Sequence, residues 1–313
     1  MVLNIILLLV GFVLLIKGAD FFVDGSSSLA RLLKIPGFVI GLTVVAMGTS
    51  APEAAVSIAA GVSGSNEIAI SNIIGSNLFN LLVVAGLSAV IKPYKIEKTI
   101  LKRDFPVNVC ISAVLLVMLL LGASLGRIDG VILLVLFVAY IAYVVYKAFK
   151  DRSNTIEEPE GKKLSPLLSV ICVVGGLAAV IFGGDMVVDN AVAIAQRLNW
   201  SETFIGLTII AIGTSLPELV TSVVAAKKGE SGLAMGNVIG SSIFNIMFVL
   251  GLSTAISPIP TDSSMIVNAI ILLSVTAVIY LASLIKKGLG RVVGGVCVAG
   301  YAAYTVYLIM TTV

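Results

Sequence analysis

The sequence predicts an all-α polytopic membrane protein of ten transmembrane helices, arranged as two inverted five-helix repeats. Three observations lead to this prediction: the composition, the placement of basic residues and an internal repeat. Of 313 residues, 58% are hydrophobic and only 12% are charged, and the mean hydropathy is +1.13. Soluble domains carry about 25% charged residues, so we expect most of this chain to lie in lipid.

Long apolar runs define the helices. A spanning helix needs about 20 predominantly apolar residues, and continuous runs without alternation favour helices over a barrel. The first run lacks a preceding basic stretch and a following small-residue cleavage site, so we expect it to be a retained helix. The ten predicted spans are 2–18, 36–60, 68–91, 105–122, 128–148, 165–184, 203–225, 233–256, 265–285 and 291–311.

Basic residues are concentrated in alternate loops. If the N-terminus lies outside, the loops after the odd-numbered spans face the cytoplasm, and they hold 18 of the 20 Lys and Arg residues. Only Arg127 and Arg197 then lie outside. The positive-inside rule therefore predicts a multi-pass protein of the cytoplasmic membrane with both termini outside. The polar segment 150–164 is predicted to be a cytoplasmic linker.

The chain repeats itself at an offset of 165 residues. "GLTVVAMGTSAPE" at 41–53 matches "GLTIIAIGTSLPE" at 206–218 at 9 of 13 positions, and "SNIIGSNLFN" at 71–80 matches "GNVIGSSIFN" at 236–245 at 6 of 10. The halves are 1–149 and 165–313. Each half has five predicted spans, an odd number, so the second half enters the membrane from the opposite side. Inverted repeats of this kind are typical of secondary transporters, whose sites lie at the repeat interface.

Each repeat places a proline beside a glutamate inside an apolar stretch. Pro52 and Pro217 lack an N–H and should free the carbonyls of Gly48 and Gly213, four residues back. We therefore expect a broken helix at membrane depth, which is tolerated only where it faces protein or water. Freed carbonyls are hard oxygen ligands suited to Na⁺ and Ca²⁺.

Polar side chains share one helical face at each of these motifs, because they are three or four residues apart. Ser, Thr and Asn in membrane helices also serve as packing contacts, and for these residues both interpretations stay open. The four stripes are Thr49, Ser50 and Glu53; Thr214, Ser215 and Glu218; Asn72, Ser76 and Asn80; and Asn237, Ser241 and Asn245.

The two glutamates point to cations. A carboxylate in mid-membrane costs at least about 2.5 kcal/mol and usually marks an ion or proton pathway, and no basic residue lies in the predicted membrane core near Glu53 or Glu218. Oxygen ligands without histidine argue against zinc or copper and suit Ca²⁺ or Na⁺. Two ionised glutamates neutralise one Ca²⁺ or two Na⁺, so these ions should compete for shared oxygens.

Four aspartates repeat at the same offset. Asp20 and Asp24 correspond to Asp185 and Asp189, at the ends of spans 1 and 6. We expect them to be interfacial anchors rather than direct ion ligands.

With "GTSxPE" and "GSxxxN" present in both copies, the chain resembles the cation/Ca²⁺ exchanger superfamily, particularly prokaryotic Na⁺/Ca²⁺ exchangers, whose α-repeats are similar to 41–80 and 206–245. The resemblance implies alternating access, with spans 1 and 6 moving across a core of spans 2, 3, 7 and 8. The implied Ca²⁺ ligands are Glu53, Glu218 and the carbonyls of Thr49 and Thr214. The implied Na⁺ ligands are Ser50, Ser76, Ser215, Ser241 and carbonyls near Ala46 and Ala211, with Asn80 lining the central position.

Asn245 departs from some family members, which have an aspartate there. The asparagine is similar to that of potassium-independent members, which implies no K⁺ requirement. It also removes one negative charge from the candidate site and leaves the coupling ion open.

We therefore expect a Na⁺-driven Ca²⁺ antiporter, not an enzyme, that binds the transported ions and no resident cofactor. Lipid is its surrounding, a monomer suffices for the site, and no nucleic-acid partner is expected. Ca²⁺/H⁺ exchange is the alternative, because buried glutamates can carry protons without histidine. A passive cation channel is a remote alternative, since channels usually build their filter from several subunits. An intramembrane enzyme is disfavoured because no histidine is present to activate a serine.

Overall fold

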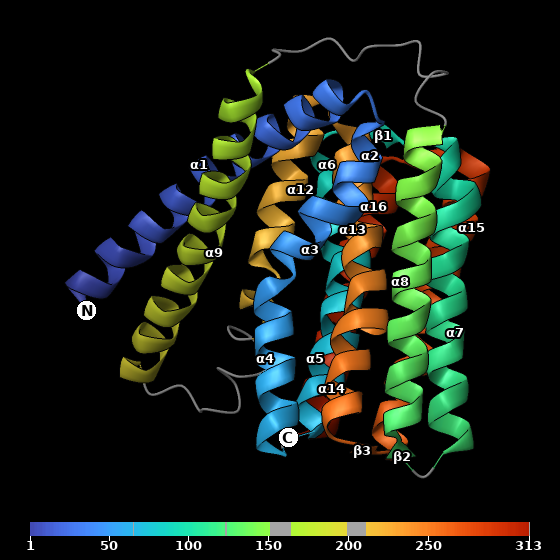
Figure 1. Cartoon of the computed structure of the whole chain (residues 1–313). Helices are drawn as coiled ribbons and strands as arrows, with labels where there is room; N and C mark the ends of the chain where they lie inside the picture. The colour runs from blue at the N-terminus through green and yellow to red at the C-terminus, as the bar shows by residue number, and fades with distance from the viewer. Residues whose placement is uncertain (65, 123, 151–163, 199–210, 313) are drawn as a thin grey trace.

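The computed structural model describes the whole chain except residues 65, 123, 151–163, 199–210 and 313. The described residues are almost entirely helical (Figure 1). Up to residue 150 the helices are α1 (Val2–Leu33), α2 (Gly37–Ile40), α3 (Ala46–Thr49), α4 (Ala51–Ser63), α5 (Asn66–Phe79), α6 (Ala85–Ile91), α7 (Phe105–Leu121) and α8 (Arg127–Lys150). After it they are α9 (Pro166–Arg197), α11 (Ala211–Gly213), α12 (Leu216–Lys228), α13 (Ser231–Phe244), α14 (Gly251–Ile256), α15 (Ser263–Lys286) and α16 (Arg291–Thr312).

Wider π-helical turns interrupt several of these helices. They are η1 (Gly41–Val45), η2 (Asn80–Val84), η3 (Ile100–Asp104) and η6 (Asn245–Leu250). Such turns are rare and are frequent at functional sites. Two of them, η2 and η6, begin at the asparagines that close the two repeated motifs.

Eight of the described helical stretches are long and apolar enough to cross a membrane, and the bent pair Gly37–Thr49 and Ala51–Ser63 makes a ninth. The predicted span 203–225 lies partly in 199–210, outside the described residues, and its described part contains α11 and α12. The multi-pass helical architecture is therefore confirmed, whereas ten spans stay a prediction.

The helices of the first and sixth predicted spans are much longer than predicted. The runs 2–18 and 165–184 become α1 and α9, each of 32 residues. The apolar runs end near Asp20 and Asp185. The helices continue past these residues because a charged side chain can stay in a helix when it has an ion-pair partner or contact with solvent. Close backbone contact holds this pair together: a Cβ on Gly18 would lie 2.8 Å from Ala179 Cβ, and one on Gly183 would lie 2.6 Å from Leu15 N.

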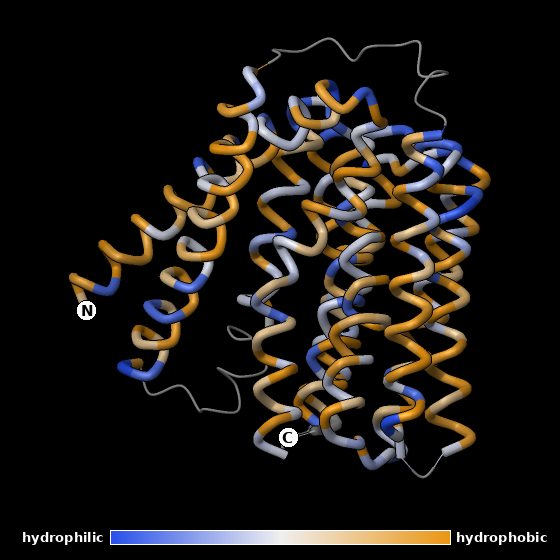
Figure 2. Tube along the Cα trace, in the orientation of Figure 1, coloured by the Kyte–Doolittle hydropathy of each residue, from blue (hydrophilic) through white to orange (hydrophobic). Residues whose placement is uncertain are grey.

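The helices that carry the repeated motifs lie at the centre. In the spans Glu67–Ile91 and Ser231–Ile256, 83% and 78% of the most apolar stretch is buried, against 11% in Arg291–Met310. Figure 1 shows α1 and α9 splayed away from the other helices, with α7, α8 and α15 along the opposite side. Hydrophobic residues dominate the lengths of these outer helices (Figure 2), as expected of surfaces that face lipid.

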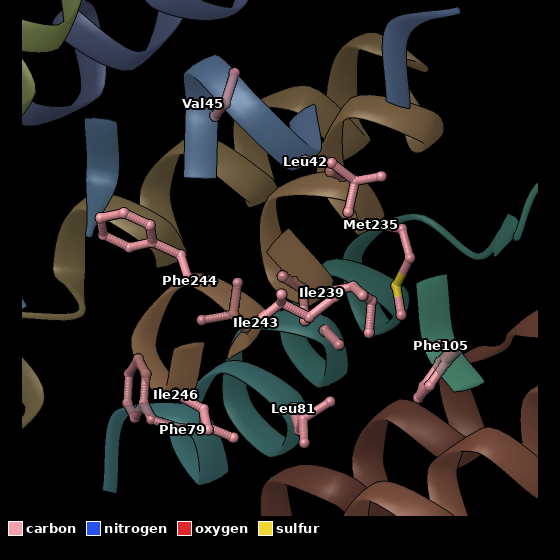
Figure 3. Packing of buried hydrophobic residues seen from close by; sticks show 14 of the residues in the cluster. Leu42, Val45, Phe79, Leu81, Phe105, Met235, Ile239, Ile243, Phe244 and Ile246 are labelled. Atoms are coloured by element: carbon pink, nitrogen blue, oxygen red, sulfur yellow. The ribbon is translucent and has the colours of Figure 1, made fainter. Parts of the chain in front are cut away.

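Small residues allow α13 to approach the first half of the chain closely. A Cβ on Gly236 would lie 2.6 Å from the carbonyl oxygen of Phe38, and one on Gly240 would lie 2.7 Å from that of Leu42. Around this contact, Leu42, Met235 and Ile239 form part of the buried apolar packing (Figure 3). Close backbone packing of this kind replaces the hydrophobic effect between helices in lipid.

Two short antiparallel ribbons join loops of the two halves. Strand β1 (Tyr94–Lys95) pairs with β4 (Gly288–Leu289), and β2 (Ser124–Leu125) pairs with β3 (Ile259–Pro260). β1 and β3 are related by the 165-residue offset, yet they lie at opposite ends of the bundle (Figure 1).

Candidate functional site

The helix of the first motif breaks at Ser50. Its backbone, at φ −82° and ψ 10°, leaves the helical region, and Pro52 follows within the first turn of α4. The helical segments on the two sides of the break are bent by 49°, which confirms the predicted kink. The prediction of a free Gly48 carbonyl is wrong, because a backbone N–H at the end of α3 reaches it.

The second motif breaks in the same way. Ser215 has φ −92° and ψ 6°, and Pro217 is the second residue of α12. The N–H of Ser215 bonds to the carbonyl of Ile212 at 3.2 Å, three residues back instead of four. Both helix breaks therefore occur at the serine of "GTSxPE", because the proline two residues later cannot continue the regular hydrogen-bond ladder.

The two glutamates are each held by a serine of the other motif. Ser50 Oγ donates to Glu218 Oε1 at 2.7 Å, and Ser215 Oγ donates to Glu53 Oε1 at 2.8 Å. All four side chains are completely buried. The crossed hydrogen bonds bring the carboxylates of the two halves to one site.

Asparagines on the next helix fix the start of each broken helix. Asn72 Nδ2 donates to Ser57 Oγ at 3.0 Å and to the carbonyl of Glu53 at 3.3 Å. The second half repeats this with Asn237, Ser222 and the carbonyl of Glu218, at 2.9 and 3.5 Å. Thr49 Oγ1 lies 3.1 Å from Asn237 Oδ1, so this network also crosses between the halves. Ser57 and Ser222 were missed by the sequence interpretation, although their shared offset of 165 was a usable signal.

Several buried polar side-chain atoms of the predicted ligand residues have no hydrogen-bond partner in the described part of the chain. Because buried polar atoms are nearly always paired, such atoms are candidates for contact with a bound ion or water. The atoms are Glu53 Oε2, Glu218 Oε2, Ser76 Oγ, Thr214 Oγ1, Asn245 Oδ1 and both polar side-chain atoms of Asn80.

Ser241 and the Ala46 carbonyl lie beside Glu218 and Ser50. Ser241 Oγ is 3.5 Å from both Glu218 Oε1 and the carbonyl oxygen of Ala46. The Ala46 carbonyl also accepts the N–H of Ser50 at 3.0 Å. Ala211 begins α11. Hydrogen bonds thus join Ser50, Ser215 and Ser241 to the two glutamates, while the role of each predicted residue as an ion ligand stays a prediction.

The donor set fits a hard cation. It contains carboxylate, hydroxyl, amide and carbonyl oxygens, and no group of three or more His, Cys, Asp or Glu occurs among the described residues. With only two carboxylates, an ion would need the neutral oxygens to complete its coordination. Ca²⁺ accepts six to eight such flexible ligands.

A cavity of about 490 Å³ lies between α9 and the two broken helices. Pro52, Thr214 and Pro217 line it from the two broken helices, and Asp185 and Asp189 line it from α9. The aspartates therefore face the same cavity as the prolines of both motifs, within an unbroken helix. The expectation that they sit at the end of a span is corrected by the length of α9.

Comparison with known proteins identifies the family. A family model described as "Sodium/calcium exchanger protein" matches residues 3–146 and 168–310. The chain belongs to the sodium/calcium exchanger family. As a member of this family of antiporters, the chain is a multi-pass membrane transport protein and not an enzyme. The resemblance to cation/Ca²⁺ exchangers is thereby confirmed.

Individual exchangers and related proteins match over most of their length. The chain is 41% identical over 264 residues to the putative antiporter CaxA of Alkalimonas amylolytica, covering 83% of this chain and 82% of that protein. It is 31% identical over 349 residues to the sodium/calcium exchanger MaX1 of Methanosarcina acetivorans, covering 97% and 98%. Its fold matches the sodium-calcium exchanger NCX_Mj, soaked with 2.5 mM Na⁺ and 0.1 mM Ca²⁺, at a TM-score of 0.84 and 33% identity over 99% of this chain and 98% of that one.

Proposed function

We propose that the chain is a secondary active antiporter that exchanges Na⁺ for Ca²⁺ across the cytoplasmic membrane by alternating access. The observation that carries the proposal is the crossed pair of buried glutamates, Glu53 and Glu218, each held by a serine of the other half and each with one unpartnered oxygen. The relatives MaX1 and NCX_Mj are sodium/calcium exchangers, which supports the same pair of ions here.

Shared oxygens are the basis of the exchange. Two carboxylates balance one Ca²⁺ or two Na⁺, so occupation by one ion removes ligands from the other. The proposed ligand set comprises the side chains of Glu53, Glu218, Ser50, Ser76, Ser215, Ser241, Asn80 and Asn245 and the carbonyls of Thr49, Thr214, Ala46 and Ala211. The transported ions are the only bound groups that the mechanism needs.

We further propose that the halves 1–149 and 165–313 are inverted five-helix repeats, joined by a cytoplasmic linker at 150–164, with both termini outside. The two ribbons support this, because the equivalent strands β1 and β3 lie at opposite ends of the bundle (Figure 1). Equivalent turns end α4 and α12 at Gly64 and Gly229, with φ of 78° and 85°. On this arrangement the cavity belongs to the extracellular half of the membrane.

The two ends of α12 differ in a way that suits alternating access. At its start, Pro217 lines the cavity. At its end, Lys228 Nζ bonds to Asp24 Oδ1 at 2.7 Å and to the carbonyl of Asp20 at 2.8 Å. Arg31 and Glu230 form a second ion pair nearby, at 3.2 Å. On the proposed orientation these contacts hold α1 against α12 on the cytoplasmic side while the cavity lies on the other side, and we infer an outward-facing state from them.

Reconstitution into proteoliposomes tests the proposal. An imposed Na⁺ gradient should drive uptake of radioactive Ca²⁺, and a pH gradient alone should not. The reverse result would establish Ca²⁺/H⁺ exchange and overturn Na⁺ as the coupling ion. Ca²⁺ flux that needs no counter-ion would establish a channel and overturn antiport itself.

A further inference from the structure

Two buried asparagines join the central helices of the two halves. Asn77 of α5 donates from Nδ2 to the carbonyl oxygen of Ser242 at 3.1 Å, and Asn245 donates from Nδ2 to Asn77 Oδ1 at 3.2 Å. Both asparagine side chains are fully buried. Phe79 and Ile246, close to them in sequence, belong to the surrounding apolar packing (Figure 3), so bulk water does not compete for these amides.

One backbone carbonyl sets the orientation of both amides. A carbonyl oxygen can only accept a hydrogen bond, so Asn77 must turn its NH₂ group towards Ser242. Asn77 Oδ1 then faces Asn245, which must donate a hydrogen bond to it from its own NH₂ group. As a result, Asn245 Oδ1 points away from the pair, and it has no partner among the residues that the structure describes.

That free oxygen lies on the helical face that carries the candidate site. Asn245 follows Ser241 by one helical turn, and Ser241 Oγ lies 3.5 Å from Glu218 Oε1. We propose that Asn77 is a positioning residue that holds Asn245 with its oxygen turned towards the transported cation, an inference that rests on the proposed function. An Asn245 amide turned the other way would present N–H donors, whose positive partial charge repels a cation.

The first half of the chain lacks this arrangement. Asn80 is the counterpart of Asn245, but the counterpart of Asn77 is Ser242, whose hydroxyl donates to the Val238 carbonyl of its own helix at 3.0 Å. Both polar side-chain atoms of Asn80 are without a partner in the described residues. The two motif asparagines are therefore inequivalent: Asn245 is an oriented oxygen donor, and Asn80 is free to turn.

The replacement Asn77→Leu tests this role, because leucine has nearly the same size but no hydrogen-bonding group. The measurement is the Ca²⁺ concentration that raises the melting temperature of the purified protein by a fixed amount, which increases in proportion to the Kd for Ca²⁺ and does not depend on the coupling ion. We expect Asn77→Leu to raise this concentration by about tenfold, as for loss of one contact to a charged group. Asn108→Leu in α7 is the matched control, since Asn108 is also a buried asparagine, and it should leave the concentration unchanged.

The same replacement in an Asn245→Asp variant separates the orienting effect of Asn77 on residue 245 from its effect on helix packing. In Asn245→Asp both terminal atoms of residue 245 are oxygens, so no partner is needed to orient it. Adding Asn77→Leu to this background should not raise the Ca²⁺ requirement, because an aspartate needs no partner to orient it and offers no N–H to Asn77 Oδ1. Equal losses in both backgrounds, or no loss with Asn245 present, would overturn the inference.

Two further results keep the test decisive. If Asn77→Leu does not fold, Asn77→Ser replaces it, because serine is too short to bridge Ser242 and Asn245, and the same pair of backgrounds is compared. If the unmodified protein shows no Ca²⁺-dependent stabilisation, the proposed function fails and the inference falls with it. If Ca²⁺ stabilises the unmodified protein and the Asn77 variant needs no more Ca²⁺ than it does, the inference is overturned while the proposed function stands.

Discussion

The hydroxyl of Ser50 donates a 2.7 Å hydrogen bond to the carboxylate of Glu218, 168 residues further along the chain. Ser215 and Glu53 form the matching bond at 2.8 Å. The short hydrogen bond to each carboxylate therefore comes from the serine of the other "GTSxPE" motif.

Loss of either glutamate charge should stop coupled transport. In Glu53→Gln and Glu218→Gln the side chain keeps its shape but no longer balances a cation, so we expect Ca²⁺ exchange to fall at least about tenfold in each variant, equivalent to about 1.4 kcal/mol. Proteoliposome uptake measures the effect, with membrane insertion checked separately. Coupled exchange that survives in both variants refutes the assignment of the site.

Removal of the crossed serines should weaken ion binding without abolishing it. Ser50→Ala and Ser215→Ala each delete a hydrogen bond to a buried carboxylate, a contact worth about 1.5–3 kcal/mol. We expect half-maximal exchange to require about tenfold more Ca²⁺ in both variants. Ser63→Ala is the matched control on α4, because the Ser63 hydroxyl bonds to the carbonyl of Ala60 in its own helix and to no carboxylate among the described residues. A different size of effect in the two motif variants contradicts the equivalence of the two bonds.

Release of Lys228 should favour opening on the cytoplasmic side. Lys228→Gln removes the ion pairs with Asp20 and Asp24. Because these groups are partly exposed, the ratio of outward-facing to inward-facing protein should fall by at most about fivefold. The measurement is labelling of Ala55→Cys in the cavity by a membrane-impermeant thiol reagent, in a background without the three native cysteines. Labelling should slow in Lys228→Gln but not in Lys227→Gln. Unchanged labelling in both variants would show that the ion pairs of Lys228 do not hold the cytoplasmic side closed.

Glu97 should make stability depend on pH near neutrality. It lies between the spans, beside Gly232 at the start of α13, where burial and repulsion from Asp104 raise its pKa from 4.5 to about 7. The unfolded chain ionises Glu97 from about pH 4.5 upwards, whereas the folded chain resists ionisation until about pH 7. Stability should therefore fall as pH rises through this window.

Comparison with a neutral side chain isolates this effect. The melting temperature of the unmodified protein should fall relative to that of Glu97→Gln between about pH 4.5 and 7 and then level off. Glu67→Gln, at an exposed position on α5, serves as the control and should follow the unmodified protein. A constant difference between Glu97→Gln and the unmodified protein at all pH values would show that charge on Glu97 is not responsible.

Close contact at Gly236 should not tolerate a methyl group. In Gly236→Ala the new Cβ would lie 2.6 Å from the backbone oxygen of Phe38, so α13 must move away from α2, at a cost of about 1–3 kcal/mol. Gly295→Ala on α16 meets nothing within 4 Å and should keep its melting temperature. Equal melting temperatures for the two variants would show that the contact is not tight.

Most of the candidate site was predictable because it is repeated. Prolines in "GTSAPE" and "GTSLPE" predicted both helix breaks, and four-residue spacing predicted which polar side chains share a face. The sequence failed where its signal was indirect. The lengths of α1 and α9 were underestimated because hydropathy falls at Asp20 and Asp185 while the helices continue.

The pairing of particular atoms lay beyond the sequence. Asn77 has no asparagine counterpart, since Ser242 stands at the equivalent position, and no pattern indicated that its amide meets Asn245. Likewise, Lys228 is one of many basic residues near the loops, and only the fold places it against Asp24.

By itself, the sequence determined that this chain is a multi-pass helical membrane protein and that two carboxylates recur in equivalent broken helices. Composition, helical periodicity and proline chemistry act locally, so they can be read along the chain. Only the tertiary structure decided that Ser50 binds Glu218 rather than Glu53, because that choice depends on how helices of the two halves cross. It also decided which oxygens are left without a partner, because a buried atom is unpaired only in relation to everything packed around it.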